Sequence, residues 1–283
     1  MLRRDPEKYG DWLKKLQGGR TFLRSNAIAL RDLFFKRALE RLKLIDLIYG
    51  VGRKADDIAD DDAPLPRGWT SASDYIAHLL EFLRSRNTTD DELEFLLGHV
   101  LDVGDELGID PRREIGLVLR SLLFDARRRE SLKLVIVPRA ELDGNNFLLD
   151  EEGTIGLCLL ILGETRESFA AISLLGIATR IMYTLRDLRE DMGKRLCNVP
   201  SEDFESFGMY VPDTTSAQAI QDWYDSGPVR AWRAKEAQRG LELYREYDAV
   251  RDKLKVHDFT RAILEYLYER STKTGLEDVL KAA

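Results

Sequence analysis

The residues of this chain best suited to chemistry are two groups of aspartates. Five of the seven residues from Asp56 to Asp62 are aspartates, and Asp187 and Asp191 follow later inside a long apolar segment. Residues four apart on a helix project from one face, so Asp56 and Asp60 converge, as do Asp187 and Asp191. Carboxylates held this close repel one another unless a positive charge lies against them. The spacing therefore indicates two places where a cation would be stabilising.

The ligand chemistry of these groups favours magnesium. Carboxylate oxygens with no His or Cys nearby are typical magnesium ligands, and the ion usually shares its coordination with substrate phosphates. Basic residues that could donate hydrogen bonds to phosphate oxygens flank both groups. They are Arg53, Arg186, Arg189, Lys194 and Arg195. Two alternatives stay open: residues 56–62 could be a solvated helix end, and the last three basic residues could simply pair with neighbouring acids on the surface.

The elements that must position the aspartates are predicted to be helices, so the chain is all-α. Apolar residues recur at helical spacing over most of the length. A Thr89–Glu92 capping box opens one helix, and the basic run Arg127–Arg129 suits the C-terminal end of the next. Ala63, Pro64 and Pro66 end the first helix just after its aspartates. The predicted helices cover 25–60, 72–86, 89–107, 111–129, 140–163, 166–193, 215–225, 229–254 and 257–270.

Only Leu132–Val137 has the β-branched character of a strand, and one strand without a partner cannot form a sheet. We expect this segment to be a connector. The proline- and glycine-bearing stretches look like loops within a domain, so we predict a single domain over residues 1–283.

Composition limits the range of functions. The 283 residues carry a net charge of −7 with acidic and basic residues interleaved, so nucleic acid is not an expected partner. Cys158 and Cys197 lack metal or disulfide spacing and are interpreted as reduced packing residues of a cytoplasmic protein. The amino-terminal residues show no signal-peptide pattern. The apolar stretches Thr154–Leu162 and Ser168–Thr179 are too short to span a bilayer, which leaves peripheral membrane contact open.

Three segments carry a family resemblance. The stretch from Tyr49 to Asp60 follows the pattern Y-x-x-x-R-x-x-D-D-x-x-D, the first aspartate-rich motif of the squalene and phytoene synthase family. The stretch Leu175–Asp191, with the proline and acidic residues that follow it, is similar to the family's second motif, L-G-x-A-x-Q-x-x-N-x-L-R-D-x-x-E-D. Between them, Glu152–Gly156 resembles the family's A-G-x-V-G segment. The chain thus resembles this family over roughly residues 25–208.

The resemblance implies an all-helical isoprenoid synthase fold, a helical bundle around a central apolar cavity with the two aspartate motifs facing each other across its mouth. It also implies that Mg²⁺ ions join the motifs to a prenyl diphosphate donor. By position, the metal ligands would be Asp56, Asp60, Asp187 and Asp191. Asp57 would support them, and Arg186 would contact the diphosphate or the carbocation. The same resemblance makes Tyr49, Arg53, Phe147, Tyr183 and Asn198 the expected substrate-binding positions. For Tyr183, which could stack on a planar acceptor or a carbocation, the alternative of a core tyrosine with a hydrogen-bonded hydroxyl stays open.

Departures from the family pattern concern the second substrate. Tyr183 stands where the family has a metal-binding asparagine, and Asn198 stands where it has the aromatic residue of Y-L-P. The family's glutamine is Arg180, its middle-motif tyrosine is Phe147, and no Ser-Phe pair occurs near Ala29-Leu30. A phenol is a poor magnesium ligand. We therefore predict a transferase that keeps the prenyl diphosphate donor but alkylates a small hydrophobic or aromatic acceptor, with carbazole as the analogy.

Two other functions remain open at this point. One is head-to-head condensation of two prenyl diphosphates, as in squalene or phytoene synthases. The other is a catalytically silent family member that acts as an assembly or lipid-binding factor. The presence of both aspartate pairs favours an enzyme over the silent alternative.

Overall fold

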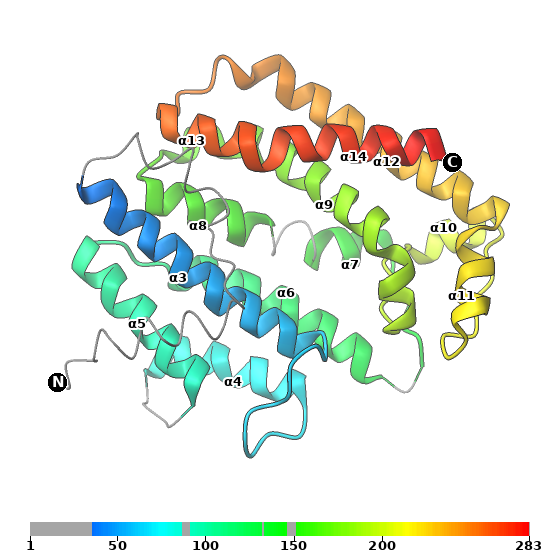
Figure 1. Cartoon of the computed structure of the whole chain (residues 1–283), viewed down its shortest axis with the longest axis horizontal. Helices are drawn as coiled ribbons and strands as arrows, with labels where there is room; N and C mark the ends of the chain where they lie inside the picture. Colours follow the sequence, from blue (N-terminus) through cyan, green and yellow to red (C-terminus); the bar gives the residue numbers. More distant parts are fainter. Residues whose placement is uncertain (1–35, 87–90, 132, 146–150, 283) are drawn as a thin grey trace. The chain divides into compact units, whose positions relative to one another are not determined.

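The computed structural model describes residues 36–86, 91–131, 133–145 and 151–282, and its regular elements over these ranges are helices (Figure 1). The all-α prediction is confirmed. Within the described ranges, the only β-type pairing is an isolated parallel bridge between Val135 and Leu196. The segment around Val135 is therefore a connector, as predicted.

The chain forms two compact units. The first unit comprises the chain up to Ala126 together with Leu157–Gly163. The second unit comprises Arg127–Gly156 and Glu164–Ala283. The division falls within two helices, and the single domain expected from the sequence stays a prediction.

The first unit is built on α3 (Lys36–Ala59), which packs against α4 (Ala72–Ser85) and α5 (Glu92–Leu107), and α4 also contacts α5. It also contains most of α6 (Arg112–Glu130) and the second half of α8 (Glu152–Leu162). Apolar residues recurring at helical spacing supply its core, as expected for amphipathic helices. Fully buried members include Leu44, Leu47, Ile58, Tyr75, Ile76, Leu79, Leu96 and Leu97.

The second unit is organised around α9 (Phe169–Gly193), which packs against α12 (Gly227–Arg251), α14 (Arg270–Ala282) and α11 (Ala217–Tyr224). The shorter helices α7 (Arg139–Leu142), α10 (Ser201–Ser206) and α13 (Asp258–Ile263) complete it, with a 3₁₀ turn η2 (Arg166–Ser168) before α9. Between α13 and α14 the helix widens into a π-helical stretch, η3 (Leu264–Glu269). Its core includes Leu185, Leu188, Met192, Trp223, Trp232 and Leu276.

Gly240 explains how closely three of these helices meet. A Cβ atom at Gly240 on α12 would lie 2.9 Å from Leu276 of α14 and 3.3 Å from Ile181 of α9. Both distances are shorter than ordinary van der Waals contact, so only glycine fits without a shift of the neighbouring side chains. The position of α9 is thus set by contacts on the side of the helix that carries Ile181.

Several helices differ from the predictions. The N-cap of α5 is Asp91, whose Oδ1 accepts hydrogen bonds from the Leu93 and Glu94 amides at 2.9 and 3.0 Å, so the predicted cap at Thr89 is wrong. Over the predicted helix 140–163 the structure describes α7, a π-helical stretch at 143–145, and α8; residues 146–150 lie outside the described residues, so a continuous helix there stays a prediction. The predicted helix 257–270 continues as α14 to Ala282, and α10 was not predicted at all.

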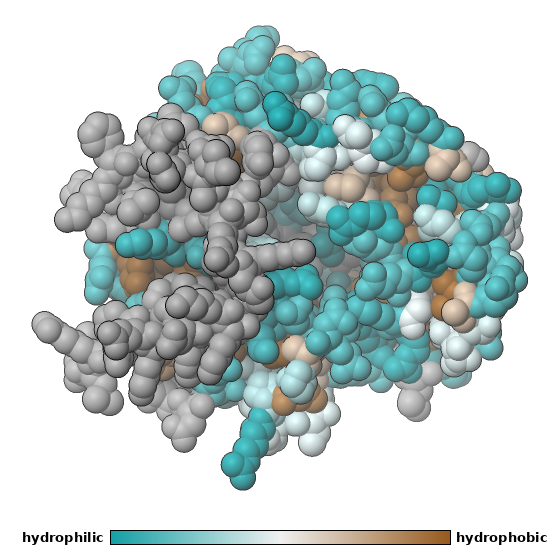
Figure 2. All heavy atoms as spheres, viewed as in Figure 1, coloured by the Kyte–Doolittle hydropathy of each residue, from teal (hydrophilic) through white to brown (hydrophobic). Residues whose placement is uncertain are grey.

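The described residues show few exposed large hydrophobic side chains. Figure 2 shows a face on which the described residues are mainly hydrophilic, with hydrophobic side chains in separate small groups. Among the described residues, the large hydrophobic side chains that are exposed are Tyr49, Tyr210 and Val211. By length and composition α9 alone among the described helices could cross a membrane. Because α9 supplies core residues of the second unit, we assign its apolar character to packing.

Candidate functional site

The first acidic motif lies at the C-terminal end of α3. Asp56 and Asp57 are in the last turn, and Asp60 follows directly after it. Arg53 donates to both helical carboxylates, with Nη1 2.7 Å from Asp56 Oδ2 and Nη2 2.8 Å from Asp57 Oδ1. Burial lowers the pKa of Arg53, but the charges of Asp56 and Asp57 outweigh it and raise that pKa above its usual value. The arginine therefore offsets part of the repulsion that the aspartate spacing implies.

The chain leaves α3 through a left-handed turn. Asp61 has φ of 62°, and the Asp62 amide donates to the Asp57 carbonyl at 2.8 Å. This hydrogen bond satisfies a carbonyl that the helix end would otherwise leave without a partner. The helix ends at Ala59, in agreement with the predicted stop before the prolines. The side chains of Asp56 and Asp57 remain 34% and 25% exposed, which leaves both partly accessible to a ligand.

The second acidic motif lies on the last two turns of α9. Arg186 holds Asp187 in a bidentate pair, with Nε 2.7 Å from Oδ1 and Nη2 2.7 Å from Oδ2. Its guanidinium also lies 4.6 Å from the centre of the Tyr183 ring, a cation–π contact. The hydrogen bonds to Asp187 raise the pKa of Arg186, against a smaller lowering by burial. Tyr183, Arg186 and Asp187 thus form one group in which Arg186 is exposed and Tyr183 is partly buried against the core of the second unit.

Asp191 is held differently, by the turn that follows α9. Asn198 Nδ2 donates to Asp191 Oδ2 at 3.2 Å, and the Leu196 amide donates to the Asp191 carbonyl at 2.8 Å. Arg195 lies between them with φ of 60°. The same hydrogen bond and the same left-handed residue follow Asp57 at the end of α3, so both acidic helices end with one backbone geometry. Asn198 was predicted to contact substrate; its amide points to Asp191, and its direct role with substrate stays a prediction.

Several predicted contacts have local partners. Lys194 pairs with Glu190 at 3.2 Å, the surface pairing that the sequence left open. Arg189 donates to Gln221 at 2.8 Å, and Arg195 donates to the Ser131 carbonyl at 3.4 Å. These three basic residues are therefore secondary candidates for phosphate binding.

Two other sequence-predicted positions need separate mention. Tyr49 lies on α3 and is 50% exposed, so its ring is accessible to a ligand. Phe147 and the Ala29-Leu30 segment lie outside the described residues. Their predicted roles in substrate binding stay predictions.

The donor set suits magnesium when a substrate supplies further ligands. Both motifs present partly exposed carboxylates, which are hard oxygen donors. Within the described ranges, no group of three or more His, Cys, Asp or Glu side chains is arranged to hold a metal ion. Each motif could therefore supply a few carboxylate ligands, with phosphate oxygens and water completing the coordination. The residues fit a substrate-bridged ion better than a fully protein-enclosed one.

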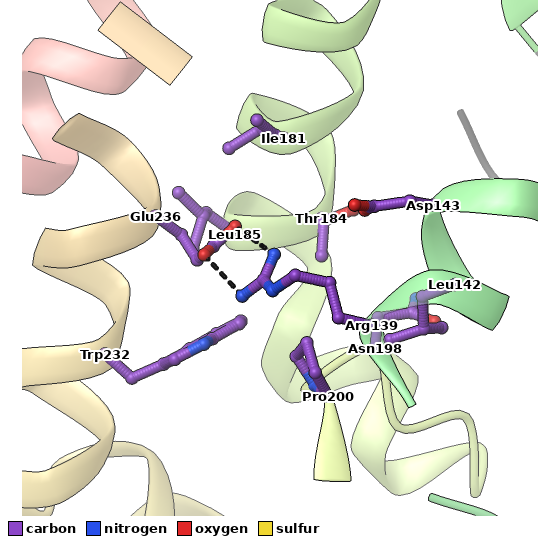
Figure 3. Close-up of a pocket in the computed structure, with 10 residues that line it drawn as sticks. All are labelled: Arg139, Leu142, Asp143, Ile181, Thr184, Leu185, Asn198, Pro200, Trp232 and Glu236. Atoms are coloured by element: carbon purple, nitrogen blue, oxygen red, sulfur yellow. Dashed lines mark hydrogen bonds and ion pairs between the residues drawn. The ribbon is translucent and has the colours of Figure 1, made fainter. Parts of the chain in front are cut away.

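A small cavity lies within the second unit beside α9. Its lining includes Arg139, Asp143, Thr184, Asn198, Pro200, Trp232 and Glu236 (Figure 3). The cavity volume of about 20 Å³ is enough for roughly one water molecule. It is too small for a prenyl tail, and the apolar cavity expected for that tail stays a prediction.

A buried ionic network surrounds this cavity, and sequence reasoning missed it. Figure 3 shows Arg139 extending from the start of α7 to Glu236 on α12, with a shortest distance of 2.7 Å. Arg139 also donates to Asp203, which accepts further hydrogen bonds from Trp232 and Lys235, each at 3.0 Å. Burial raises the pKa of Asp203, but the hydrogen bonds from Lys235 and Trp232 and the charge of Arg139 outweigh it and hold the pKa below its usual range.

The cysteines have the expected packing roles. Neither Cys158 nor Cys197 forms a disulfide; Cys158 is partly buried, and Cys197 is fully buried beside Asn198. Burial raises the pKa of Cys197 to about 12. A thiol with this pKa is protonated at neutral pH and is a poor nucleophile.

The arrangement of helices is that of the isoprenoid synthase fold, the class implied by the aspartate motifs. One solved structure that is similar to this chain is squalene synthase HpnC from Alicyclobacillus acidocaldarius. The TM-score is 0.66 at 16% sequence identity, and the match covers 99% of this chain and 96% of that chain. No family model matches the chain, and no curated protein matches it. At this identity the likeness establishes the fold and leaves the reaction to be argued from the residues.

Proposed function

We propose that the protein is a Mg²⁺-dependent prenyltransferase that ionises an allylic prenyl diphosphate and transfers the prenyl group to an aromatic, carbazole-like acceptor. The observation that carries the proposal is the repeated pairing of arginine with partly exposed aspartates, Arg53 with Asp56 and Asp57 and Arg186 with Asp187. These pairs lie on two helices of a fold that squalene synthase HpnC shares.

Each residue type has a defined task in this reaction. Asp56, Asp60, Asp187 and Asp191 would hold the ions. Bound Mg²⁺ would neutralise the charge that develops on the departing diphosphate. Arg53 and Arg186, always protonated, would donate hydrogen bonds to the same phosphate oxygens.

The reaction breaks the allylic C–O bond, and its electron pair leaves with the diphosphate. A carbon of the aromatic acceptor then attacks the allylic cation and loses its proton to the released diphosphate or to water. Fixed positive charges that are already in place when the bond breaks lower the barrier without reorganisation.

Tyr183 supports an aromatic acceptor. Its ring lies on the acidic side of α9 and already accepts the Arg186 guanidinium at 4.6 Å. A ring that stacks on a planar cation can stack on a planar acceptor or stabilise a carbocation. The amide that the family carries at this position would do neither as well.

The proposal is tested by incubating the protein with Mg²⁺ and prenyl diphosphates of several chain lengths, with and without carbazole or indole. Diphosphate release and product mass are measured. We expect a prenylated aromatic product, and loss of turnover in Asp56→Asn and Asp187→Asn. Asp252→Asn is the matched control, because that side chain is 85% exposed and belongs to neither aspartate motif. Absence of turnover with every donor would refute the proposal and favour a binding or assembly role.

A second candidate is head-to-head condensation of two prenyl diphosphates. It corresponds to the printed name of a similar solved structure, a squalene synthase. The same assay separates the two candidates, because condensation joins two prenyl chains without any aromatic acceptor. A product of that mass would replace the aromatic prenyltransferase proposal.

A further inference from the structure

The turn after α9 is clamped by a buried arginine. Arg128, near the end of α6, is 3% exposed and donates Nη1 to Asn198 Oδ1 at 3.0 Å and Nη2 to the Cys197 carbonyl. Asn198 is itself 8% exposed. Both contacts lie within the second unit. A guanidinium cannot be neutralised in a protein, so Arg128 presents a fixed positive charge and two fixed donor directions to this turn.

Arg128 determines how the Asn198 amide is oriented. An amide has an accepting oxygen at one end of its plane and a donating nitrogen at the other. Because the oxygen accepts from Arg128, the nitrogen faces Asp191 Oδ2 at 3.2 Å. The flipped amide would bring donor against donor at Arg128 and oxygen against carboxylate at Asp191. The Asn198 amide therefore has only one favourable orientation between Arg128 and Asp191.

The backbone of the turn is fixed independently of this contact. The Leu196 amide donates to the Asp191 carbonyl, and Leu196 also pairs with Val135 in the β-bridge. These bonds place the turn but do not act on the Asp191 carboxylate. The Asn198 amide does act on it, and a change in that amide can alter the carboxylate while the turn stays in place.

We propose that Arg128 and Asn198 are positioning residues for Asp191, fixing its Oδ2 and so setting the direction in which the carboxylate can bind a divalent cation. This inference rests on the proposed function, in which Asp191 is a metal ligand. Hydrogen-bond partners behind a metal ligand orient it, and their loss typically weakens metal binding about 10- to 100-fold. Neither residue needs to touch the ion or the substrate.

The sharpest test is Asn198→Asp. The new carboxylate keeps an acceptor for Arg128 but has no donor for Asp191 and repels it, so the turn should fold while Asp191 loses its orientation. Gln218→Glu is the matched control, an amide-to-acid change at an exposed site in the same unit where Gln218 donates to Asp222 at 2.7 Å. The probe is Mn²⁺ with inorganic diphosphate, measured by electron paramagnetic resonance and by calorimetry on the full chain.

We expect Asn198→Asp to bind Mn²⁺ about 10- to 100-fold more weakly than the wild type, with a thermal midpoint close to that of Gln218→Glu. Arg128→Lys keeps the buried charge but not the two fixed donor directions, so it should weaken Mn²⁺ binding in the same sense. If Asn198→Asp does not fold, the test is whether folded Arg128→Lys binds Mn²⁺ more weakly than the wild type.

The outcomes separate this inference from the proposed function. If Asp191→Asn loses Mn²⁺ binding while folded Asn198→Asp and Arg128→Lys bind like the wild type, the positioning role is overturned and the proposed function stands. If the wild type does not bind Mn²⁺ with diphosphate, or Asp191→Asn binds it normally, Asp191 is not a ligand and both fail.

Discussion

Arg139→Met should destabilise the second unit by about 2 kcal/mol. Arg139 joins α7 to α10 and α12 by donating to Asp203 and to Glu236, the latter at 2.7 and 3.3 Å. Both carboxylates are 7% exposed. Methionine keeps most of the aliphatic side chain but removes the charge and every donor.

The magnitude follows from the burial of the partners. Removing one member of a buried ion pair costs about 3–5 kcal/mol, whereas an exposed pair contributes roughly 0–1 kcal/mol. Arg139 is 28% exposed, and each carboxylate keeps a second cation, Lys235 for Asp203 and Arg239 for Glu236. The expected cost therefore lies between the two limits, at about 2 kcal/mol.

The cost should depend on pH. The pKa of Asp203 in the folded protein is below its usual value, so its ionised form stabilises the fold above the unfolded pKa, near 3.9. That stability is lost as the pH falls through the lower folded pKa. Without Arg139 the folded pKa of Asp203 rises, so the difference between variant and wild type should be full at neutral pH and shrink below about pH 4.

Urea unfolding followed by tryptophan fluorescence measures this effect. The background should carry Trp12→Phe and Trp69→Phe, so that emission comes from Trp223 and Trp232, which are both buried in the second unit. Arg84→Met is the control, because Arg84 pairs with Glu81 at 3.3 Å on the exposed surface of α4. Surface changes usually alter the free energy of unfolding by less than about 0.5 kcal/mol. A loss of that size or smaller for Arg139→Met at neutral pH would refute the reasoning.

Three further predictions follow from the site and its surroundings. Iodoacetamide at pH 8 should modify Cys158 in the native protein but Cys197 only after unfolding, as seen by mass spectrometry, because Cys197 is buried with a pKa of about 12. Arg195→Gly should raise the free energy of unfolding by about 0.5–1 kcal/mol, since glycine adopts positive φ without strain. Asp61→Gly should raise the free energy of unfolding by less, because aspartate tolerates this conformation better than arginine does. Equal increases for the two variants in urea titrations would contradict this explanation. Tyr183→Phe should keep acceptor turnover in the prenyl-transfer assay, whereas Tyr183→Ala should lower it about tenfold through loss of a stacking interaction of roughly 1–2 kcal/mol; equal rates for the two variants would argue against the ring.

The helical fold could be predicted because its signal is local. Apolar residues at helical spacing identify α4, α5, α6, α9 and α12, and the prolines after Asp62 mark the end of α3. The aspartate pairs could also be placed on helix ends, since the i, i+4 spacing needs no tertiary information. The left-handed turn that follows each motif could not be predicted from the sequence, because neither turn has glycine at its left-handed position.

The supporting contacts of the site depend on tertiary packing and were not predictable. The run Arg127–Arg129 is interpreted from the sequence only as suiting the C-terminal end of a helix, yet Arg128 and Arg129 are buried and only Arg127 is exposed. Arg139, Asp203 and Glu236 come from three separate helices with no common motif. A sequence does not reveal which charged residues are buried until the helices that cover them are placed.

The contact of α9 with Gly240 has a consequence for how the proposed reaction could diversify. A helix is a stiff rod, so an adjustment at Ile181 against Gly240 would be transmitted along it to Asp187 and Asp191. Replacing Gly240 with alanine could therefore re-aim the acidic end without altering any acidic residue. Natural variation in acceptor preference would then be sought among the small residues of α12 and α14 as well as among side chains that meet the substrate.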